Sequence, residues 1–373
     1  MKRTFKTILQ DLWQRLRNRM RRKRAMVFAG KQLTHVPVEV EQVGGRYEPM
    51  QLEAPATYYS GQDVMSGTIR LHVGRWHVRG ATKTALLIHG LSANHMCWKV
   101  MAEHLQQHGI EVVAVDLRGR GRSDKPRGEY GIQVHVADMC AVIEQLELNH
   151  PGRDKPIVIG HSLGAAIGMM LAWKHPEYVG KLVLMDAGAP INPINALKAY
   201  FTIRSSVQRL GTIYPNAEAY IERMKAIPML QPWDDVIEEY IRYDLEDVGD
   251  GRVRSSVPPY VIEAEYNSIG SSLSIPTIIK NSIMHPIQQA RKIIDSGILQ
   301  FRYSELRMPV LAIGAGAYNL RPGDEILPPK ALQFLQRHIP NCTIHTVEGA
   351  NHYTLIFGKF PDRDTVLLNF INA

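Results

Sequence analysis

Cysteines and long apolar runs are both scarce in this 373-residue chain, and each scarcity excludes a class of protein. Its three cysteines, Cys97, Cys140 and Cys342, are scattered without C-x-x-C spacing, so neither a disulfide framework nor a zinc site is predicted. A reducing, cytoplasmic compartment is the expectation for such a chain. No apolar run reaches the roughly 18 residues of a membrane-spanning helix. The longest run within residues 1–24 is two residues, too short for a secretory signal.

Motifs that bind phosphates or metal ions are lacking as well. The glycines of Arg118–Ser123 are two apart and lack the third glycine of a dinucleotide-binding loop, and no P-loop or metal-ligand spacing is present. We therefore expect neither a cofactor nor a metal ion.

Positive charge is concentrated at one end of the chain. The formal net charge is +8, but residues 1–25 hold ten Lys or Arg against one Asp, and the remainder carries a net charge of −1. A nearly neutral body offers no basic surface for a phosphate backbone, so no nucleic-acid partner is expected.

The basic segment, residues 1–30, has the spacing of an amphipathic helix. Its apolar residues recur at intervals of three and four, and they are Phe5, Ile8, Leu9, Leu12, Trp13, Leu16 and Met20. We expect residues 1–25 to bind an anionic membrane surface, which would make a cytoplasmic protein peripheral to the membrane. The alternative is a helix packed on its own domain or disordered in solution.

Short β-rich runs alternate with helical patterns from about residue 65. Several runs are continuously apolar, as strands buried on both faces are. The predicted strands are Thr68–Val73, Thr84–Ile88, Ile110–Val115, Pro156–Ile159, Lys181–Met185, Pro309–Ile313 and Thr343–Val347, with antiparallel strands expected within Gln32–Glu41. The predicted helices are Met96–His108, Val134–Leu148, Leu163–His175 and Lys330–His338. This alternation predicts an α/β sheet with helices on both faces.

Residues 189–303 break the alternation. Helical patterns at 217–226 and 234–245 occur there without strands between them, which indicates a helical cap over the carboxyl edge of the sheet. The predicted core is thereby divided into residues 31–188 and 304–373.

Gly160-His161-Ser162-Leu163-Gly164 lies between an apolar run and a helical pattern. A serine on a sharp strand-to-helix turn projects its hydroxyl from the sheet, and the tight backbone requires glycine beside it. Ser162 is therefore the candidate nucleophile.

Four segments in this order resemble the α/β-hydrolase superfamily, in its serine-nucleophile branch. They are Leu86-Leu87-Ile88-His89-Gly90, the loop Asp116–Ser123, the turn at Ser162, and Gly349-Ala350-Asn351-His352. The resemblance implies a mostly parallel doubly wound sheet with a helical cap inserted after the sixth strand.

A serine hydroxyl needs an imidazole to accept its proton, and the imidazole needs a carboxylate on its other nitrogen. His352 is the predicted base. The family's spacing after the strand 309–313 reaches Asn319, an amide, so the resemblance implies that Asp324 is the acid after an insertion. Asp186, which ends the sixth strand, is the alternative acid, and Glu325 is a third choice.

The resemblance also implies an oxyanion hole made by the backbone amides of Leu91 and Leu163. An apolar acyl pocket under the cap is expected, because methionine and tryptophan side chains adapt to or line such sites. The candidate lining residues are Met96, Trp98, Met224 and Trp233, with Met229 and Met284 beside them.

These features predict a serine hydrolase that cleaves carboxylic esters of small molecules through an acyl-enzyme, esterase-like or lipase-like. Two alternatives stay open. One is a carbon–carbon bond hydrolase or lactonase with the same triad, and the other is a non-catalytic ligand-binding receptor of the same fold. The sequence predicts no oligomeric state.

Overall fold

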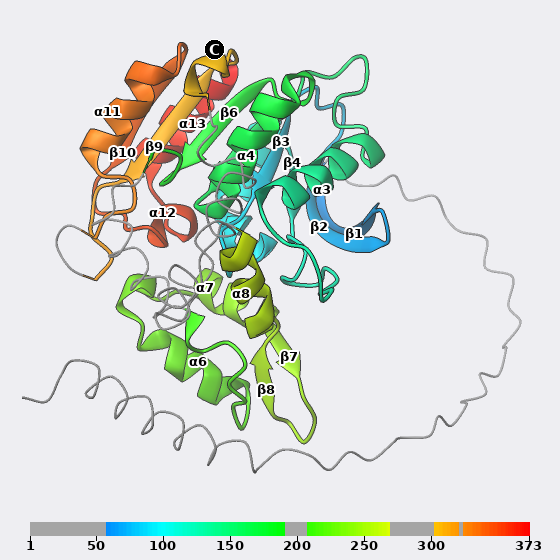
Figure 1. Cartoon of the computed structure of the whole chain (residues 1–373). Helices are drawn as coiled ribbons and strands as arrows, with labels where there is room; N and C mark the ends of the chain where they lie inside the picture. The colour runs from blue at the N-terminus through cyan, green and yellow to red at the C-terminus, as the bar shows by residue number, and fades with distance from the viewer. Residues whose placement is uncertain (1–56, 191–206, 269–301, 321–323) are drawn as a thin grey trace, which may run out of the picture. The chain divides into compact units, whose positions relative to one another are not determined.

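The structure is a computed structural model that describes residues 57–190, 207–268, 302–320 and 324–373. Within these residues eight strands form one sheet in the order β1-β2-β4-β3-β5-β6-β9-β10 (Figure 1). The strands are β1 Thr57–Ser66, β2 Ile69–Val78, β3 Thr84–Ile88, β4 Glu111–Val115, β5 Ile157–His161, β6 Lys181–Met185, β9 Val310–Ala315 and β10 Cys342–Val347.

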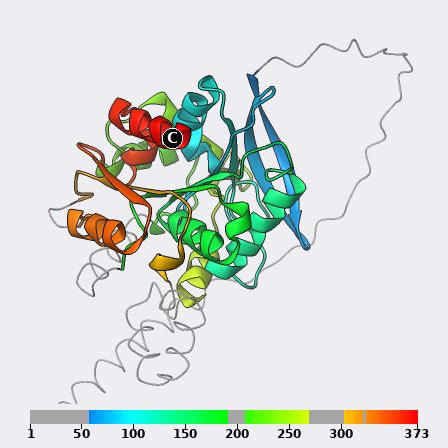
Figure 2. The ribbon, with the colours of Figure 1, turned by 90° about the horizontal axis from the view of Figure 1, so that it is seen from above.

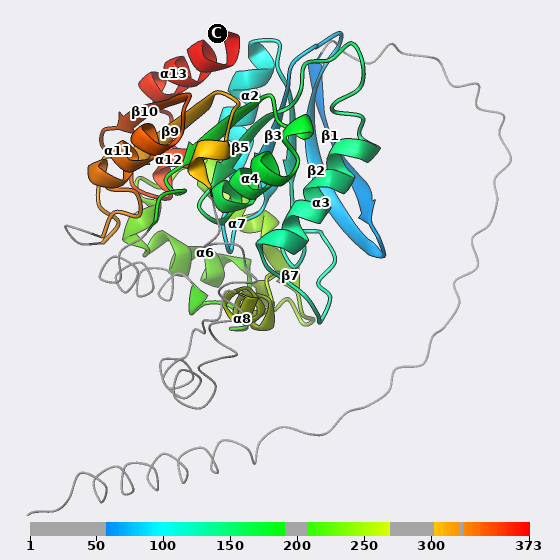
Figure 3. The ribbon, with the colours of Figure 1, turned by 45° about the horizontal axis from the view of Figure 1, so that its top comes forward.

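All pairings from β4 to β10 are parallel, whereas β1 and β2 form an antiparallel hairpin whose second strand pairs with β4. The hairpin lies at one edge of the sheet and β10 at the other (Figure 3). Strands β3, β4, β5 and β9 are buried along their whole length, which explains why they are apolar except for Thr84, Glu111 and His161 at strand ends. The predicted mostly parallel α/β sheet is confirmed.

Helices cover both faces of the sheet (Figure 2). One face carries α2 Lys99–Gln107 and α13 Pro361–Asn372, and the other carries α3 Ile132–Gln145, α4 Leu163–Lys174 and α11 Pro329–His338. Each face has its own apolar cluster, because alternate side chains of the central strands point to opposite sides. Short helical turns complete the core: η1 His95–Trp98, η2 Pro176–Tyr178, η5 Tyr303–Glu305 and α12 Thr354–Phe357.

A mostly helical segment follows β6, the sixth strand, where the cap is predicted, and we refer to this segment as the cap. Its described elements are α6 Ala217–Lys225, η3 Pro228–Leu230, α7 Asp235–Tyr243, β7 Leu245–Asp247, β8 Val253–Ser255 and α8 Pro259–Ser268. Asn216 and Asp234 cap α6 and α7, each accepting a hydrogen bond from a backbone N–H three residues on.

Three elements differ from the sequence predictions. The cap contains a small hairpin, β7–β8, where no strand was expected, because three-residue strands are too short to show an alternating pattern. Strand β1 was not predicted, because it lies at the edge of the sheet and most of its residues are exposed, so it lacks an apolar pattern. The predictions for residues 1–30, for Gln32–Glu41 and for Met284 lie outside the described residues.

No helix among the described residues is long and apolar enough to cross a lipid bilayer.

Candidate active site

Ser162 lies in the turn between β5, which ends at His161, and α4, which begins at Leu163. Its backbone has φ 54° and ψ −117°, in a region that side chains other than glycine rarely adopt. Such strain is retained where the surrounding structure enforces it, and it marks functional positions.

Two glycines make this turn possible. A Cβ on Gly160 would lie 2.2 Å from the carbonyl oxygen of Gly164, and a Cβ on Gly164 would lie 2.0 Å from that of Ile88. Both distances are far below van der Waals contact. The sequence pattern around Ser162 is therefore required by the close approach of β3, β5 and α4.

His352 follows β10 and is 7 % exposed. Its Nδ1 donates a hydrogen bond to Asp186 Oδ2 over 2.7 Å. Asp186 directly follows β6 and is 1 % exposed, and its other oxygen, Oδ1, accepts from Ala315 N at 3.1 Å. Its φ of 50° lies in the left-handed region, which aspartate tolerates better than most residues. The Asp186 carboxylate is thus fixed between the ends of β6 and β9 while it orients the imidazole.

Asp324, the predicted acid, does not carry out this task. Its carboxylate accepts hydrogen bonds from the backbone amides of Asn319 and Leu320, both at 2.8 Å. Asn319 in turn accepts from His352 N through Oδ1 at 3.0 Å. Asp324 therefore stabilises the loop that holds the backbone of His352, and the prediction that it pairs with the imidazole is corrected in favour of Asp186. Glu325, the third choice, is partly exposed, and the His352 Nδ1 bond goes to Asp186.

Two other histidines near the nucleophile, His161 and His89, form hydrogen bonds with backbone groups. His161 Nε2 donates to the carbonyl of His352 at 2.8 Å, and the two rings are 4.4 Å apart. Burial, with repulsion from His352, holds the pKa of His161 well below its usual value. His89 Nδ1 donates to Gly90 O, and its Nε2 accepts from Leu117 N. Burial lowers the pKa of His89 to about 3, so both rings stay neutral.

The turn at Gly90 and Leu91 lies directly beside the nucleophile. A Cβ built on Gly90 would be 3.3 Å from Ser162 Cβ. Leu163 is the first residue of α4, where backbone N–H groups have no partner within the helix. Of the two predicted oxyanion-hole residues, Leu163 therefore follows Ser162 directly, and Leu91 follows Gly90, whose turn lies beside Ser162.

A pocket lies between the core and the cap, next to these groups. Its walls are mainly apolar, and its cavity volume is about 30 Å³, within about 370 Å³ of empty space that includes open solvent. It is lined by Ser92, Arg209, Met224, Ile227, Met229, Leu230, Tyr240, Tyr353 and Phe357. Ser92 follows Leu91 and Tyr353 follows His352, so the pocket reaches two loops, the one beside Ser162 and the one bonded to His161.

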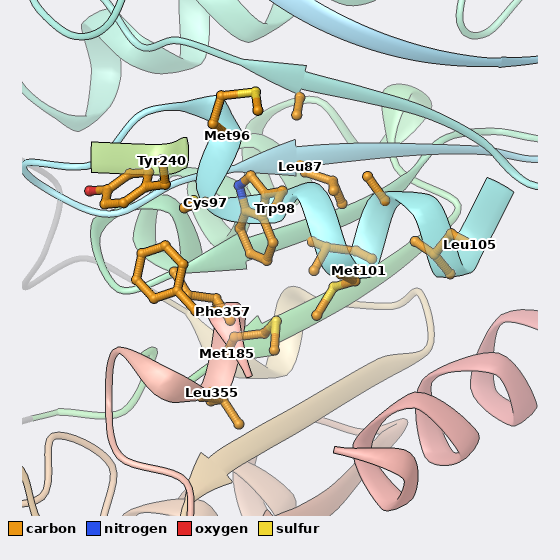
Figure 4. Close-up of a cluster of buried hydrophobic side chains, with 14 of the residues drawn as sticks. Leu87, Met96, Cys97, Trp98, Met101, Leu105, Met185, Tyr240, Leu355 and Phe357 are labelled. Atoms are coloured by element: carbon orange, nitrogen blue, oxygen red, sulfur yellow. The ribbon is translucent and has the colours of Figure 1, made fainter. Parts of the chain in front are cut away.

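Of the predicted lining residues, Met224 and Met229 do line this pocket. Met96 and Trp98 belong instead to the buried apolar cluster on the α2 face, where Trp98 is fully buried (Figure 4). The Trp98 ring packs edge-on against the His161 ring, with the ring centroids 6.5 Å apart, and so contacts the residue that precedes Ser162. Trp233 packs against the same cluster, partly buried. None of these three residues lines the pocket, so their contact with substrate stays a prediction.

Sequence reasoning missed two polar residues of this region. Arg209 lines the pocket and donates from Nε to Tyr220 OH at 2.9 Å. Burial by itself would lower its pKa, but Tyr220 and Asp244 raise it above the usual value, so the guanidinium is charged. Asn319 was noted only as an amide in the place of a carboxylate. No local pattern marks either residue, since each acts through partners distant in sequence.

Metal ligation has no candidate within the described part of the chain, where no group of three or more His, Cys, Asp or Glu side chains could hold an ion.

Comparison with known proteins agrees with this architecture. A family model described as the alpha/beta hydrolase fold matches residues 84–217. The solved structure of an E-2-(acetamidomethylene)succinate hydrolase superposes with a TM-score of 0.61 at 23% identity, covering 85% of this chain and 100% of that one. Residues 84–217 thus match the α/β-hydrolase superfamily, and the described residues have its fold.

Relatives within the α/β hydrolases have diverse names. The 2-(acetamidomethylene)succinate hydrolase of Mesorhizobium japonicum is 28% identical over 195 residues, which are 50% of this chain and 67% of the relative. Lipase LipV of Mycobacterium tuberculosis is 34% identical over 124 residues, or 33% of this chain and 44% of that lipase. Uncharacterized proteins of M. tuberculosis and Mycobacterium bovis are 32% identical over 120 residues, and the match spans only a third of their length. This α/β hydrolase is thus similar to hydrolases of more than one class.

Proposed function

We propose that this α/β hydrolase is a serine esterase that cleaves carboxylic esters through an acyl-enzyme on Ser162. The observation that carries the proposal is the 2.7 Å hydrogen bond from His352 Nδ1 to the buried Asp186 carboxylate, beside a serine held at positive φ. This is the arrangement in which a carboxylate fixes the imidazole tautomer and stabilises its cation.

In the proposed reaction, His352 Nε2 takes the proton of the Ser162 hydroxyl as the serine oxygen attacks the ester carbonyl. The oxyanion that forms accepts hydrogen bonds from the amides of Leu91 and Leu163. The tetrahedral intermediate collapses, the C–O bond to the alcohol breaks, and His352 gives its proton to the leaving alkoxide. Water, deprotonated by the same imidazole, then releases the acid from Ser162.

The pocket favours an apolar acyl group. Its Met224, Met229 and Phe357 side chains offer flexible apolar contacts next to the loops of Leu91 and His352. An acyl chain attached to Ser162, with its carbonyl at the two amides, would direct its tail toward this pocket, which has to widen to admit it.

Labelling with a fluorophosphonate probe tests the nucleophile directly, because such probes react only with an activated serine. We expect the wild-type full chain to be labelled and Ser162→Ala to be unlabelled. Ser304→Ala, an exposed serine in η5, is the matched control and should be labelled like the wild type. Labelling that persists in Ser162→Ala would refute the assignment of Ser162 as the nucleophile. In a separate experiment on the wild type, p-nitrophenyl esters of increasing acyl length would measure the chain-length preference.

A carbon–carbon bond hydrolase is the second candidate, favoured by one relative. The 2-hydroxy-6-oxo-2,4-heptadienoate hydrolase of Pseudomonas putida is 29% identical over 158 residues, 41% of this chain and 54% of that enzyme. Both reactions would use the same three side chains. Turnover of a vinylogous 1,5-diketone with a kcat/KM above that of every p-nitrophenyl ester would favour the carbon–carbon hydrolase.

A receptor of the same fold would bind ligand without turnover, so an unlabelled wild-type chain with no esterase activity would favour that alternative.

The N-terminal segment, residues 1–25, lies outside the described residues, and its binding to an anionic membrane surface remains a proposal from sequence. Co-sedimentation with phosphatidylserine vesicles should pellet the full chain and leave a chain lacking residues 1–30 in solution. Equal pelleting of the two would contradict it.

A further inference from the structure

The oxyanion loop at Leu91 is held by a buried arginine. Arg120, in the loop after β4, donates from Nε to the carbonyl of Leu91 at 2.9 Å and from Nη1 to the carbonyl of Arg118 at 2.8 Å. Its side chain is fully buried. Because the guanidinium is planar and its donors have fixed directions, this contact fixes the orientation of the peptide group that follows the Leu91 amide.

The same guanidinium is paired with a residue of the cap. Glu265 of α8 accepts from Arg120 Nη1 at 2.7 Å and from His135 Nε2 at 2.6 Å, both through Oε1. Burial alone would raise the pKa of Glu265, but His135 and Arg120 lower it to about 2. The carboxylate is therefore charged at neutral pH, and removing it would leave the buried Arg120 cation without its counter-charge.

Helix α8 also reaches Leu91 through apolar contacts. The Leu91 side chain packs against a small apolar cluster of the cap, formed by Val207, Leu210, Val257 and Ile262. Ile262 and Glu265 are three residues apart on α8 and so lie on one face of the helix. One helical face of the cap thus contacts both the side chain of Leu91 and the arginine that binds its carbonyl.

We propose that Arg120 and Glu265 are positioning residues that make the geometry of the oxyanion hole depend on the seating of cap helix α8. This inference rests on the proposed esterase function, because it assigns the Leu91 amide to the oxyanion. It goes beyond that function by making the cap a part of transition-state stabilisation as well as a wall of the pocket. Glu265 acts through Arg120, and Arg120 acts through Leu91.

A neighbouring ion pair supplies a matched control. Arg118 forms two hydrogen bonds with Asp138 of α3, both at 2.6 Å, and Asp138 is fully buried. This pair belongs to the same loop, but its carboxylate comes from a core helix and not from the cap. Asp138→Asn removes a buried charge of equal kind and leaves the hydrogen bonds of Arg120 to Leu91 and Glu265 in place. Asp138 approaches this network only at His135 Nδ1, which is 3.9 Å from its Oδ2.

Kinetics on the full chain test the path. Deleting an oxyanion donor outright lowers kcat by about 10²–10³-fold, so a misplaced donor should lower the kcat for p-nitrophenyl butyrate by about tenfold in Glu265→Gln, with KM little changed. Arg120→Met should lose at least as much, and the double variant should lose no more than Arg120→Met, because the two residues act in series. The affinity for n-butylboronic acid, whose serine adduct places an oxygen in the oxyanion hole, should fall in parallel with kcat. Asp138→Asn should lower the melting temperature and leave kcat and boronate affinity near wild type.

Hydrogen exchange provides a readout that does not depend on activity. Glu265→Gln should accelerate exchange in the peptide covering residues 89–98, and Asp138→Asn should not. Equal exchange of this peptide in wild type and Glu265→Gln would overturn the proposal, as would additive losses of kcat in the double variant or equal losses in Asp138→Asn. If the wild type shows no esterase activity and binds no boronate, the proposed function fails, and the exchange result still decides whether α8 controls the Leu91 loop.

Discussion

Two buried aspartates lie near His352, and they contact different parts of it. Asp186, at the end of β6, binds the ring at Nδ1, whereas Asp324 binds the backbone amides of Asn319 and Leu320, and Asn319 binds the backbone N–H of His352. Both carboxylates are at most 7 % exposed. Burial and charge therefore do not distinguish the two residues, and the atoms to which they bind do.

The difference teaches that the placement of His352 is divided between two loops. The loop after β6 sets the tautomer and orientation of the imidazole, and the loop after β9 sets the position of the backbone that carries it. The Asp186 carboxylate, which is bonded to the ring, stabilises the protonated imidazole more than the neutral one. The Asp324 carboxylate is bonded to backbone amides, so it stabilises the neutral and the protonated imidazole almost equally. In the proposed reaction, only the first would contribute to the chemical step.

Asp186→Asn should give the largest loss of activity and so separates the two aspartates most clearly. Asparagine cannot stabilise an imidazolium as a charge, and its amide favours the wrong tautomer, so kcat should fall by about 10⁴-fold. The kcat for p-nitrophenyl butyrate, measured beside circular dichroism to check the fold, gives the result. Asp324→Asn is the control, and similar losses in both variants would erase the distinction.

Asp324→Asn should act on stability first. Its carboxylate accepts two backbone N–H groups, and asparagine offers one oxygen for both, so one amide loses its partner at a cost of about 1–3 kcal/mol. Urea unfolding should show this decrease, with kcat lowered by no more than about tenfold. A large loss of kcat at unchanged stability would instead indicate that Asp324 takes part in the reaction.

Asn319→Asp should have the smallest effect. The new carboxylate can still accept from His352 N, but the oxygen that replaces Nδ2 loses the 3.1 Å hydrogen bond to the carbonyl of Asp324 and repels it. We expect about 1 kcal/mol of destabilisation. Combined with Asp186→Asn, it should restore no activity, because position 319 faces the backbone of His352 and not its ring. Rescue of the Asp186→Asn variant would contradict this placement.

The fold was largely predictable because its signals are local. The buried strands are continuously apolar, and the turn at Ser162 requires glycine at fixed positions, so the sheet and the turn could be read from short segments. The acid could not be read in this way. Strands β6 and β9 are parallel neighbours, and their carboxyl ends lie at the same edge of the sheet, so an aspartate after either strand is a candidate partner for His352.

Side chains that act across long sequence separations were missed or misassigned for the same reason. Met96 and Trp98 share the residue types of a pocket, but their position on η1, packed under α7, places them in the core (Figure 4). The pairing of Arg120 with Glu265 spans 145 positions, and no spacing rule connects them.

Proton NMR of the His352 Nδ1–H tests the central claim most directly, because a proton shared with a buried carboxylate resonates far downfield of other amide and ring protons. The account predicts that this signal is present in the wild type, retained in Asp324→Asn and lost in Asp186→Asn. A signal retained in Asp186→Asn and lost in Asp324→Asn would contradict the assignment of Asp186 as the partner of His352.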